Sequence, residues 1–412
     1  MVIDTAPQHM PAPAPAAEEL VARAEAMVPA LVERQADTDR RSYYSEQTHA
    51  ELARAGFYRI LVPRRYGGYE LGIDTFLRVA MTLSRGCPST GWMFALGSAH
   101  ALPVATLFGE RAQEDLFAGG EFICPATLQP TGTATRCADG DCWVVDGTWT
   151  YCSGAPYATH FLGHAMVGGG DGEPRPMLFV VPRDRWRRLD DWGGQLGLKG
   201  SGSHSIVVEG AHVPGHLTLD THLALTSVTG GTPGLELHGN PLYGGGQGSF
   251  MQLEAAALAL GMVQGALDAY EELMRTRTTT FPPVVPRYEN ADYQYWYGES
   301  TGLVVTAEAA FANAVQQWTD TATAGPAGFT PDRELRIAAI CHQILSMCWR
   351  AMENYLFRTA GSSAVRGGSR IERIWRDMSM QHTHAGYSVF LAAIAPRELA
   401  RARFGVEAEI HG

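Results

Sequence analysis

The sequence predicts an α+β protein of three consecutive parts: an N-terminal helical domain over residues 17–120, a central β domain over 121–228 and a C-terminal four-helix bundle over 229–412. Two observations predict this fold class. Apolar residues recur every three or four positions in the first and third parts, which is typical of amphipathic helices. Short β-branched and aromatic runs separated by Gly, Pro and Asp fill the second part, which is typical of an antiparallel barrel or sandwich.

The N-terminal part shows clear helix starts and stops. Residues 1–16 are rich in Pro and Ala and are expected to form a disordered tail. The following AEELVARAEAMVPALVERQADTDR has the spacing of an amphipathic helix. Ser45 is placed to cap a second helix that stops at Gly56, and FGERAQEDLFAGG ends a further helix on glycines.

The central part contains four strand-like runs: CWVVDGTWTYC, ATHFLGHAMV, RPMLFVVP and SHSIVVEGAHVP. The first run continues into GTWTYCSGAPYATH over residues 147–160, where a Ser-Gly follows an aromatic strand. The residues alone allow two interpretations. One is an ordinary strand–turn–strand, and the other is a site that needs a small polar group at the end of a strand.

Helical patterns return after the Gly-rich TGGTPGLELHGNPLYGGGQG. Long Ala-rich stretches follow, as in a helical bundle, and the last helix is expected to run without a break over 370–405. The longest apolar runs, such as AAALALGMVQGAL, contain polar residues and are expected to be too short to cross a bilayer.

Composition argues against several classes of function. The net charge of −11 and isoelectric point near 5.7 disfavour nucleic acid or an anionic membrane as a partner. The seven cysteines form no CxxC pair and no Cys/His cluster with zinc spacing. We therefore expect free thiols in a reducing cytoplasm, with no metal site and no disulfide. No GxGxxG motif follows a strand, so this chain is not expected to bind NAD(P)H.

Six stretches, in this order, are similar to one known family: AGFYRILVPRRYGG, STGW, ATLQPTGTAT, WTYCSG, GLKGSGSHSIVVEGAHVP and RIERIWRD. Together with the order of helices, sheet and bundle, they make the chain resemble the acyl-CoA dehydrogenase superfamily over nearly its whole length. The resemblance implies that a flavin lies between the β domain and the bundle.

Two departures separate the chain from the dehydrogenases of this superfamily. A dehydrogenase needs a carboxylate that removes the α-proton of its thioester substrate. Eight residues after Asp377 stands Ala385, where many dehydrogenases have Glu, and Glu254 lies about one helical turn from the place that other members use. The Ser153-Gly154 pair instead resembles the branch of two-component flavin-dependent monooxygenases.

In this branch the resemblance implies two catalytic residues. Ser153 would approach N5 of the flavin and prolong the life of a C4a-hydroperoxide, and His384 would take the proton of a phenol. An ordinary Ser-Gly turn and a helix-face His bonded to a carbonyl are the structural alternatives. His100 stands where related hydroxylases place a substrate-contacting His, and a buried structural His fits equally well.

The resemblance also implies contacts to the flavin and to the substrate. The flavin ring would be lined by a loop, a strand end and a glycine-rich turn, which contribute Thr127, Gln129, Gly132, Thr133, Tyr151, Cys152, Ser153, Gly154 and Ser201. The flavin phosphate would be held at helix ends, with the arginines reaching across a subunit boundary, by Arg275, Arg277, Ser362 and Ser363. Candidates for the substrate pocket are Tyr243 and Trp296.

The expected function is that of the oxygenase component of a two-component flavin-dependent monooxygenase. It would use O2 and reduced FMN or FAD, with FMNH2 favoured, to hydroxylate a phenolic or aromatic polyketide-like substrate through the C4a-hydroperoxide. A separate NAD(P)H:flavin reductase would supply the reduced flavin, and a homo-oligomer, with a tetramer favoured, is expected. The alternatives are an N- or S-oxygenase of the same fold, an acyl-CoA dehydrogenase, and a flavin-free relative used for interaction.

Overall fold

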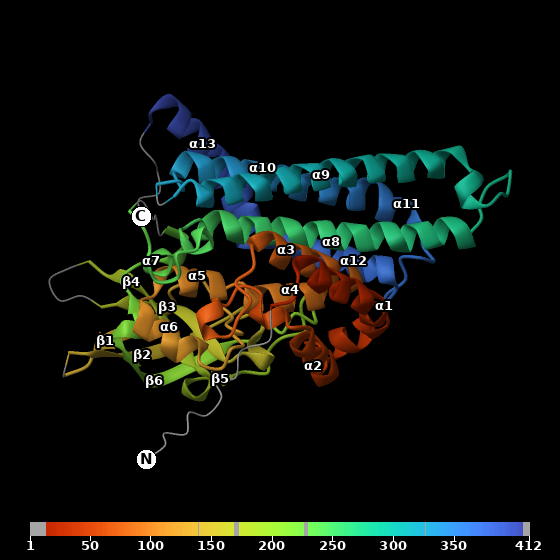
Figure 1. The fold of residues 1–412 in the computed structure, drawn as a ribbon. Helices are drawn as coiled ribbons and strands as arrows, with labels where there is room; N and C mark the ends of the chain where they lie inside the picture. Colours follow the sequence, from red (N-terminus) through yellow and green to blue (C-terminus); the bar gives the residue numbers. More distant parts are fainter. Residues whose placement is uncertain (1–13, 139, 169–172, 226–229, 326, 407–412) are drawn as a thin grey trace, which may run out of the picture.

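The computed structural model describes residues 14–138, 140–168, 173–225, 230–325 and 327–406. In Figure 1 the long helices α8, α9 and α10 lie side by side along one edge of the molecule, and the sheet and the N-terminal helices lie beneath them. The predicted order of helices, sheet and bundle is confirmed. Most of the predicted tail, and the predicted boundary near residue 228, lie outside the described residues.

The N-terminal helices form at the predicted signals. Ser45 caps α2 by accepting a hydrogen bond from Thr48 N, and Gly56 ends that helix in a left-handed conformation (φ 84°). A Cβ at Gly56 would lie 2.3 Å from the Tyr69 hydroxyl, so this position requires glycine. The six helices of this part are α1 Ala17–Arg41, α2 Glu46–Ala55, α3 Ile73–Gly86, α4 Pro88–Ser98, α5 Ala101–Leu107 and α6 Glu110–Phe117.

The strands form one seven-stranded sheet with the order β5-β6-β2-β1-β3-β4-β7. The sheet is mixed, whereas an antiparallel β domain was predicted, because β3 runs parallel to β1. The chain leaves β2 through the Ser-Gly turn and returns on the other side of β1, which reverses the expected pairing. The strands are β1 Gly132–Arg136, β2 Cys142–Trp149, β3 His160–Val167, β4 Arg175–Pro182, β5 Arg187–Arg188, β6 Ile206–Pro214 and β7 Thr218–Leu219.

Helix α8 (Gln247–Thr276) is the central helix of the bundle and contacts α3, α9, α10 and α12. By length and composition it could cross a membrane, which corrects the expectation that every apolar run is too short. However, 72% of its most apolar window is buried inside the protein, as in a core helix. The other C-terminal helices are α7 Pro233–His238, α9 Ala291–Thr323, α10 Pro331–Arg350, α11 Arg358–Ala360, α12 Arg370–Thr383 and α13 Ala395–Phe404, with π-helical turns over Ala351–Phe357 and Gly386–Ile394.

The last predicted helix is not continuous. Helix α12 ends at Thr383, and His384 adopts an extended backbone (φ −62°, ψ 135°) before the chain becomes helical again at Gly386. The ring Nδ1 of His384 accepts a hydrogen bond from Gly386 N at 3.1 Å, which helps to start the second helical segment. The break between the two helical segments therefore falls at His384, which the sequence predicted as a catalytic residue.

One expectation about the cysteines is wrong. Cys137 and Cys142 face each other across the β1–β2 hairpin with their Cα atoms 5.3 Å apart and form a disulfide. The hairpin brings them together although their spacing matches no common metal or disulfide motif. The other five cysteines are free and buried, as expected.

Candidate active site

The Ser-Gly turn after β2 is held close to helix α4. Gly154 has a φ of 98°, and a Cβ there would lie 3.0 Å from the Cα of Gly97 and 3.3 Å from Met93 O. Tyr151, just before the turn, also has a positive φ (62°) and is 60% exposed. The strand thus ends in a strained, compact turn that fixes Ser153 against a buried helix.

Ser153 belongs to a buried chain of hydrogen bonds from three elements. Trp92 Nε1 on α4 donates to Ser153 Oγ at 3.1 Å, and Ser153 Oγ lies 2.7 Å from Ser203 Oγ. Ser203 Oγ in turn lies 2.7 Å from Ser201 Oγ. The structure brings the predicted Ser153 and Ser201 together through Ser203. Trp92 is not among the residues predicted for the site, although it stands in one of the stretches that carry the resemblance.

His384 also contacts Trp92. The two rings meet edge to face with their centroids 5.6 Å apart. The His384 side chain reaches solvent, yet surrounding protein lowers the pKa of its imidazole by burial. Because Nδ1 accepts from Gly386 N, the proton of the neutral ring is on Nε2, which is then a hydrogen-bond donor. The structure thus places both His384 and Ser153 in contact with one indole ring.

The loop predicted to line a flavin is fixed by a histidine. His164 Nδ1 donates to Thr127 O at 2.7 Å, and its Nε2 accepts from Leu223 N at 3.0 Å. Burial lowers the pKa of His164 to about 4, so it stays neutral and keeps both bonds. His164 is not among the predicted residues. Its place on β3, directly beside this loop, is a contact between distant parts of the chain that local pattern does not reveal.

The same loop contains one buried polar group without a hydrogen-bond partner. Thr127 Oγ1 is buried and has no hydrogen-bond partner, while Gln129 and Thr133 are exposed. Gly132 is needed for packing, since a Cβ there would lie 2.2 Å from the Trp149 ring. An unpaired buried hydroxyl next to the exposed Leu128 fits a bound polar aromatic ring such as a flavin.

Two other residues predicted to contact flavin or substrate have side chains that bond to the protein interior instead. Cys152 is fully buried and its Sγ contacts Trp149 O at 3.2 Å, so its side chain faces the core. His100 Nδ1 donates to Cys124 O at 2.8 Å, and burial lowers the pKa of His100 to about 4. His100 is therefore a neutral, buried histidine held by the backbone, which favours its structural interpretation.

The predicted substrate residues Tyr243 and Trp296 do not lie beside Ser153. Tyr243 is fully buried, and its hydroxyl donates to Leu61 O at 3.2 Å. Trp296 packs against Tyr293 near the start of α9, at the far end of the bundle in Figure 1. Neither side chain is available to a substrate at the Ser153 turn of the same chain.

The predicted phosphate contacts also gather at that far end. Arg277 Nη1 donates to Ser363 Oγ at 3.3 Å, and Arg275, 72% exposed, pairs with Glu271. Ser362 is exposed beside them. Gln381, three residues before His384, bonds to Ala255 O on α8, and Arg277 follows Ala255 by 22 residues, or about 33 Å of helix. These four residues cannot contact a flavin at Ser153 of their own chain.

Two buried carboxyl groups lie near the bundle but do not join the site. Asp377 Oδ1 accepts from Leu198 N at 2.5 Å, and burial raises the pKa of Asp377 to about 8. Burial also raises the pKa of Glu254 on α8 to about 8, and its Oε1 has no hydrogen-bond partner. Among the described residues, no carboxylate forms a hydrogen bond or ion pair with Ser153, Trp92 or His384.

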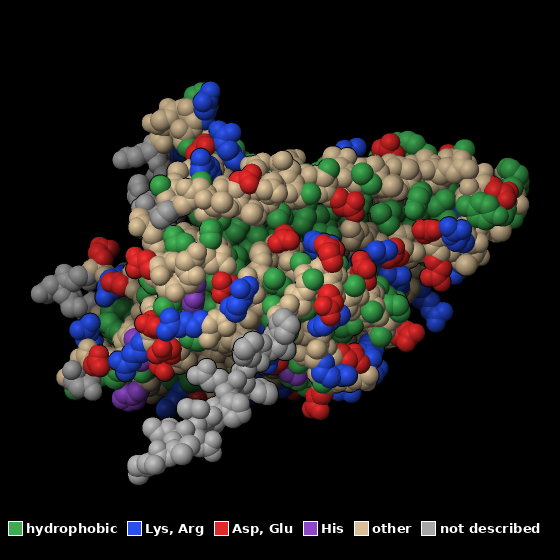
Figure 2. All heavy atoms as spheres, in the orientation of Figure 1, with side chains coloured by type: hydrophobic (Ala, Val, Ile, Leu, Met, Phe, Trp, Pro, Cys, Tyr) green, Lys and Arg blue, Asp and Glu red, His purple; other side chains and the backbone are tan. Residues whose placement is uncertain are grey.

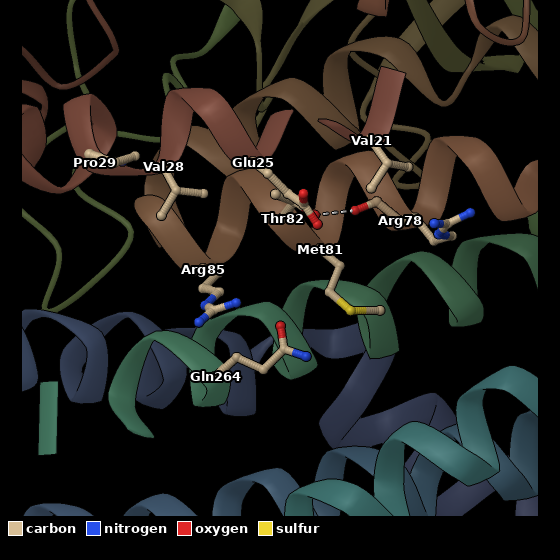
Figure 3. Close-up of a pocket in the computed structure, with 9 residues that line it drawn as sticks. All are labelled: Val21, Glu25, Val28, Pro29, Arg78, Met81, Thr82, Arg85 and Gln264. Atoms are coloured by element: carbon tan, nitrogen blue, oxygen red, sulfur yellow. Dashed lines mark hydrogen bonds between the residues drawn. The ribbon is translucent and has the colours of Figure 1, made fainter. Parts of the chain in front are cut away.

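A groove of about 470 Å³ between α1, α3 and α8 lies away from these groups (Figure 3). Its apolar floor includes Val21 and Met81, and its arginines are already ion-paired, Arg78 with Glu18 and Arg85 with Asp268. It shares no lining residue with the Ser153 turn, so we do not assign the reaction to it.

The amino-acid sequence matches two family profiles. The profile of the acyl-CoA dehydrogenase N-terminal domain matches residues 15–118, and that of the acyl-CoA dehydrogenase C-terminal domain matches residues 253–389. These matches cover the two helical parts of the fold.

Curated relatives and a solved structure are similar over most of the chain. A pigment production hydroxylase of a Rhodococcus species is 29% identical over 370 residues, which cover 89% of this chain and 92% of the relative. The flavin-dependent monooxygenase oxygenase subunit HsaA of Rhodococcus jostii is also 29% identical over 370 residues, covering 88% and 93%. The crystal structure of the 3-HSA hydroxylase from Rhodococcus sp. RHA1 aligns with a TM-score of 0.82 at 26% identity, covering 94% of this chain and 97% of that one.

Proposed function

Because the chain belongs to the acyl-CoA dehydrogenase superfamily, and to its branch of flavin-dependent monooxygenase oxygenase components, we propose that it hydroxylates a phenolic or aromatic polyketide-like substrate. One observation carries this proposal. The hydroxyl of Ser153 and the imidazole of His384 both contact Trp92, and no carboxylate among the described residues bonds to any of the three. This suits oxygen transfer to a phenol and lacks the base of a dehydrogenase.

Reduced flavin fits the unpaired buried hydroxyl of Thr127 and the small polar turn at Ser153. When bound, it supplies the electrons and the activated oxygen. Thr127, with its unpaired hydroxyl, Gln129, Gly132 and Thr133 would hold one edge of the ring, and the turn with Ser153 would hold another. FMN and FAD would both be held by these ring contacts. A separate NAD(P)H-dependent reductase would deliver the flavin, as the term oxygenase subunit implies for HsaA.

The hydrogen bonds around Ser153 decide where its own proton points. Trp92 Nε1–H can only donate, so it uses one lone pair of Ser153 Oγ. If Ser153 donates to Ser203, and Ser203 donates to Ser201, the second lone pair of Ser153 Oγ is left free to accept. We assign this direction to the chain. The Ser153 oxygen would then accept from N5–H of the reduced flavin in a buried site, where hydrogen bonds are strong.

His384 acts on the oxygen of the substrate through Nε2. The contact of Nδ1 with Gly386 N leaves Nε2 protonated, so the neutral ring donates a hydrogen bond to the phenol oxygen. The phenol proton passes to solvent, which the exposed His384 side chain reaches, and the hydrogen bond stabilises the phenolate that remains. The phenolate makes the ring carbon a better nucleophile. This role differs from the proton acceptance expected from the sequence, which would require the other tautomer and would leave Gly386 N–H without its acceptor.

The phosphate contacts would come from a second copy of the chain. Arg275, Arg277, Ser362 and Ser363 lie about 33 Å along α8 from the level of Ala255, so only a neighbouring subunit can bring them to a flavin at Ser153. Figure 2 shows hydrophobic side chains gathered along the long helices. Exposed large hydrophobic residues of this region are Phe281, Val284, Tyr288, Tyr295 and Val305. They fit a homo-oligomeric interface, for which we propose a tetramer.

The substrate class is tested with matched pairs of compounds. The protein is supplied with reduced flavin by any free reductase, and phenols are compared with their O-methyl ethers, aromatic amines and thioethers by mass spectrometry. We expect hydroxylated products from phenols and none from the ethers. Oxygenation of amines or thioethers with no turnover of phenols would replace the proposal by N- or S-oxygenation.

A further inference from the structure

Two cysteines and a histidine meet on one face of the sheet, at the β1–β2 hairpin. Cys137 N donates to Cys142 O at 2.9 Å, which closes the hairpin one position beyond the Arg136–Trp143 pair. His212 on β6 pairs with Val144 of β2. Because side chains alternate along a strand, Cys142 and Val144 share a face, and His212 reaches the cysteines diagonally.

The histidine nitrogen lies at the distances from the two sulfur atoms that a tetrahedral metal requires. The sulfur atoms are bonded to each other in the disulfide and separate when it is reduced. His212 Nδ1 lies 3.7 Å from Cys137 Sγ and 3.5 Å from Cys142 Sγ. A tetrahedral Zn²⁺ with bonds of about 2.3 Å to sulfur and about 2.0 Å to nitrogen holds these atoms about 3.6 Å apart. All three ligand atoms lie within 4.8 Å of one another.

We propose that the reduced form of this Cys2His cluster binds a divalent metal of the Zn²⁺ type. Each thiol loses its proton to become a thiolate ligand, the imidazole binds through Nδ1, and water completes the tetrahedron. In the oxidised form the same sulfur atoms form the disulfide and do not ligate. The cluster thus has two exclusive states, a metal-bound dithiolate and a disulfide.

The cluster is separate from the oxygenase site, and the proposal is independent of the proposed function. It lies at the start of β2, whereas the Ser153 turn follows the end of that strand, about 23 Å away at about 3.3 Å per residue. A bound metal would tie the hairpin to β6. It would stabilise the folded protein, because an unfolded chain does not hold the three ligands together.

Thiol labelling can isolate this pair, because the other five cysteines are buried and burial raises the pKa of each of their thiols. The full chain is reduced, freed of reductant and titrated with Co²⁺ and then Zn²⁺. We expect a sulfur-to-cobalt charge-transfer band that saturates at one metal per chain and disappears when Zn²⁺ displaces Co²⁺. Iodoacetamide should label Cys137 and Cys142 in the metal-free reduced protein and neither in the Zn²⁺-loaded protein.

Matched variants separate the cluster from unspecific binding. Cys142→Ser and His212→Ala should lose the band and the protection, while His216→Ala, whose ring pairs with Asp115 outside the cluster, should keep both. The absence of a cobalt–sulfur band in the reduced wild type would overturn the proposal. A disulfide that cannot be reduced in the folded protein, or undiminished binding by His212→Ala, would overturn it as well.

Discussion

Replacing Ser153 by Ala removes a hydroxyl that has two partners in the structure. Trp92 Nε1, 3.1 Å away, and Ser203 Oγ, 2.7 Å away, each lose a hydrogen bond. The buried indole N–H is left without an acceptor, so we expect the free energy of unfolding to fall by about 1–3 kcal/mol. The flavin would lose one charge-assisted bond of about 1.5–3 kcal/mol, which raises the rate of hydrogen peroxide release roughly ten- to a hundredfold.

The assay follows peroxide release after reduced flavin and the protein are mixed with oxygen in the absence of substrate. Ser203→Ala is the matched control, because it disturbs the same network but leaves the Ser153 oxygen free to accept from the flavin. We expect Ser203→Ala to lose similar stability and to release peroxide at nearly the wild-type rate. Equal acceleration by both variants would refute a direct contact between Ser153 and the flavin.

Three further predictions concern single residues. His384→Ala should lower phenol hydroxylation roughly ten- to a hundredfold through loss of one hydrogen bond to the phenolate, and alkaline pH should restore the activity of this variant. His384→Gln should restore part of the activity through its amide N–H. Equal rates for both variants in a pH series of product yield would argue instead for proton acceptance by the ring. Glu254 has a folded pKa raised to about 8, above its unfolded value, so its contribution to stability is present below about pH 4 and is lost as the pH rises toward 8. Glu254→Gln should flatten this part of a thermal-denaturation series and leave product yield unchanged. A large loss of yield would instead make Glu254 part of the reaction. Gly154→Ala should lower the melting temperature, since its φ of 98° and the contact 3.0 Å from Gly97 Cα cost about 1–3 kcal/mol, whereas an unchanged melting temperature would show that the turn can relax.

Local chemistry made much of the fold predictable. The cap at Ser45 and the stop at Gly56 depend on neighbouring residues only, and both are confirmed. The break at His384 was missed, because the helical spacing of apolar residues continues through it and no Pro marks it. The parallel pairing of β1 with β3 was also missed, since pairing depends on where the chain returns rather than on the strand sequences.

The site was only partly predictable, because its residues come from distant segments of the chain. Ser153 stands in a short local motif, the Ser-Gly pair after an aromatic strand, but its partners Trp92 and Ser203 come from segments 61 and 50 residues away. Arg277 was named for the flavin site, across a subunit boundary, because of its family position, and the length of α8 fits this expectation by placing it about 33 Å from the level of Ala255. The Cys137–Cys142 pair depends on the closing of a hairpin, which cysteine spacing alone does not reveal.

A single turnover with labelled oxygen tests directly whether this protein transfers oxygen to a phenol. The protein is loaded with one equivalent of reduced flavin and a phenol without oxygen, and ¹⁸O2 is then added. We expect the phenol to gain one ¹⁸O atom per chain, with little hydrogen peroxide. Stoichiometric peroxide and an unchanged phenol, from protein that has bound the reduced flavin, would contradict it.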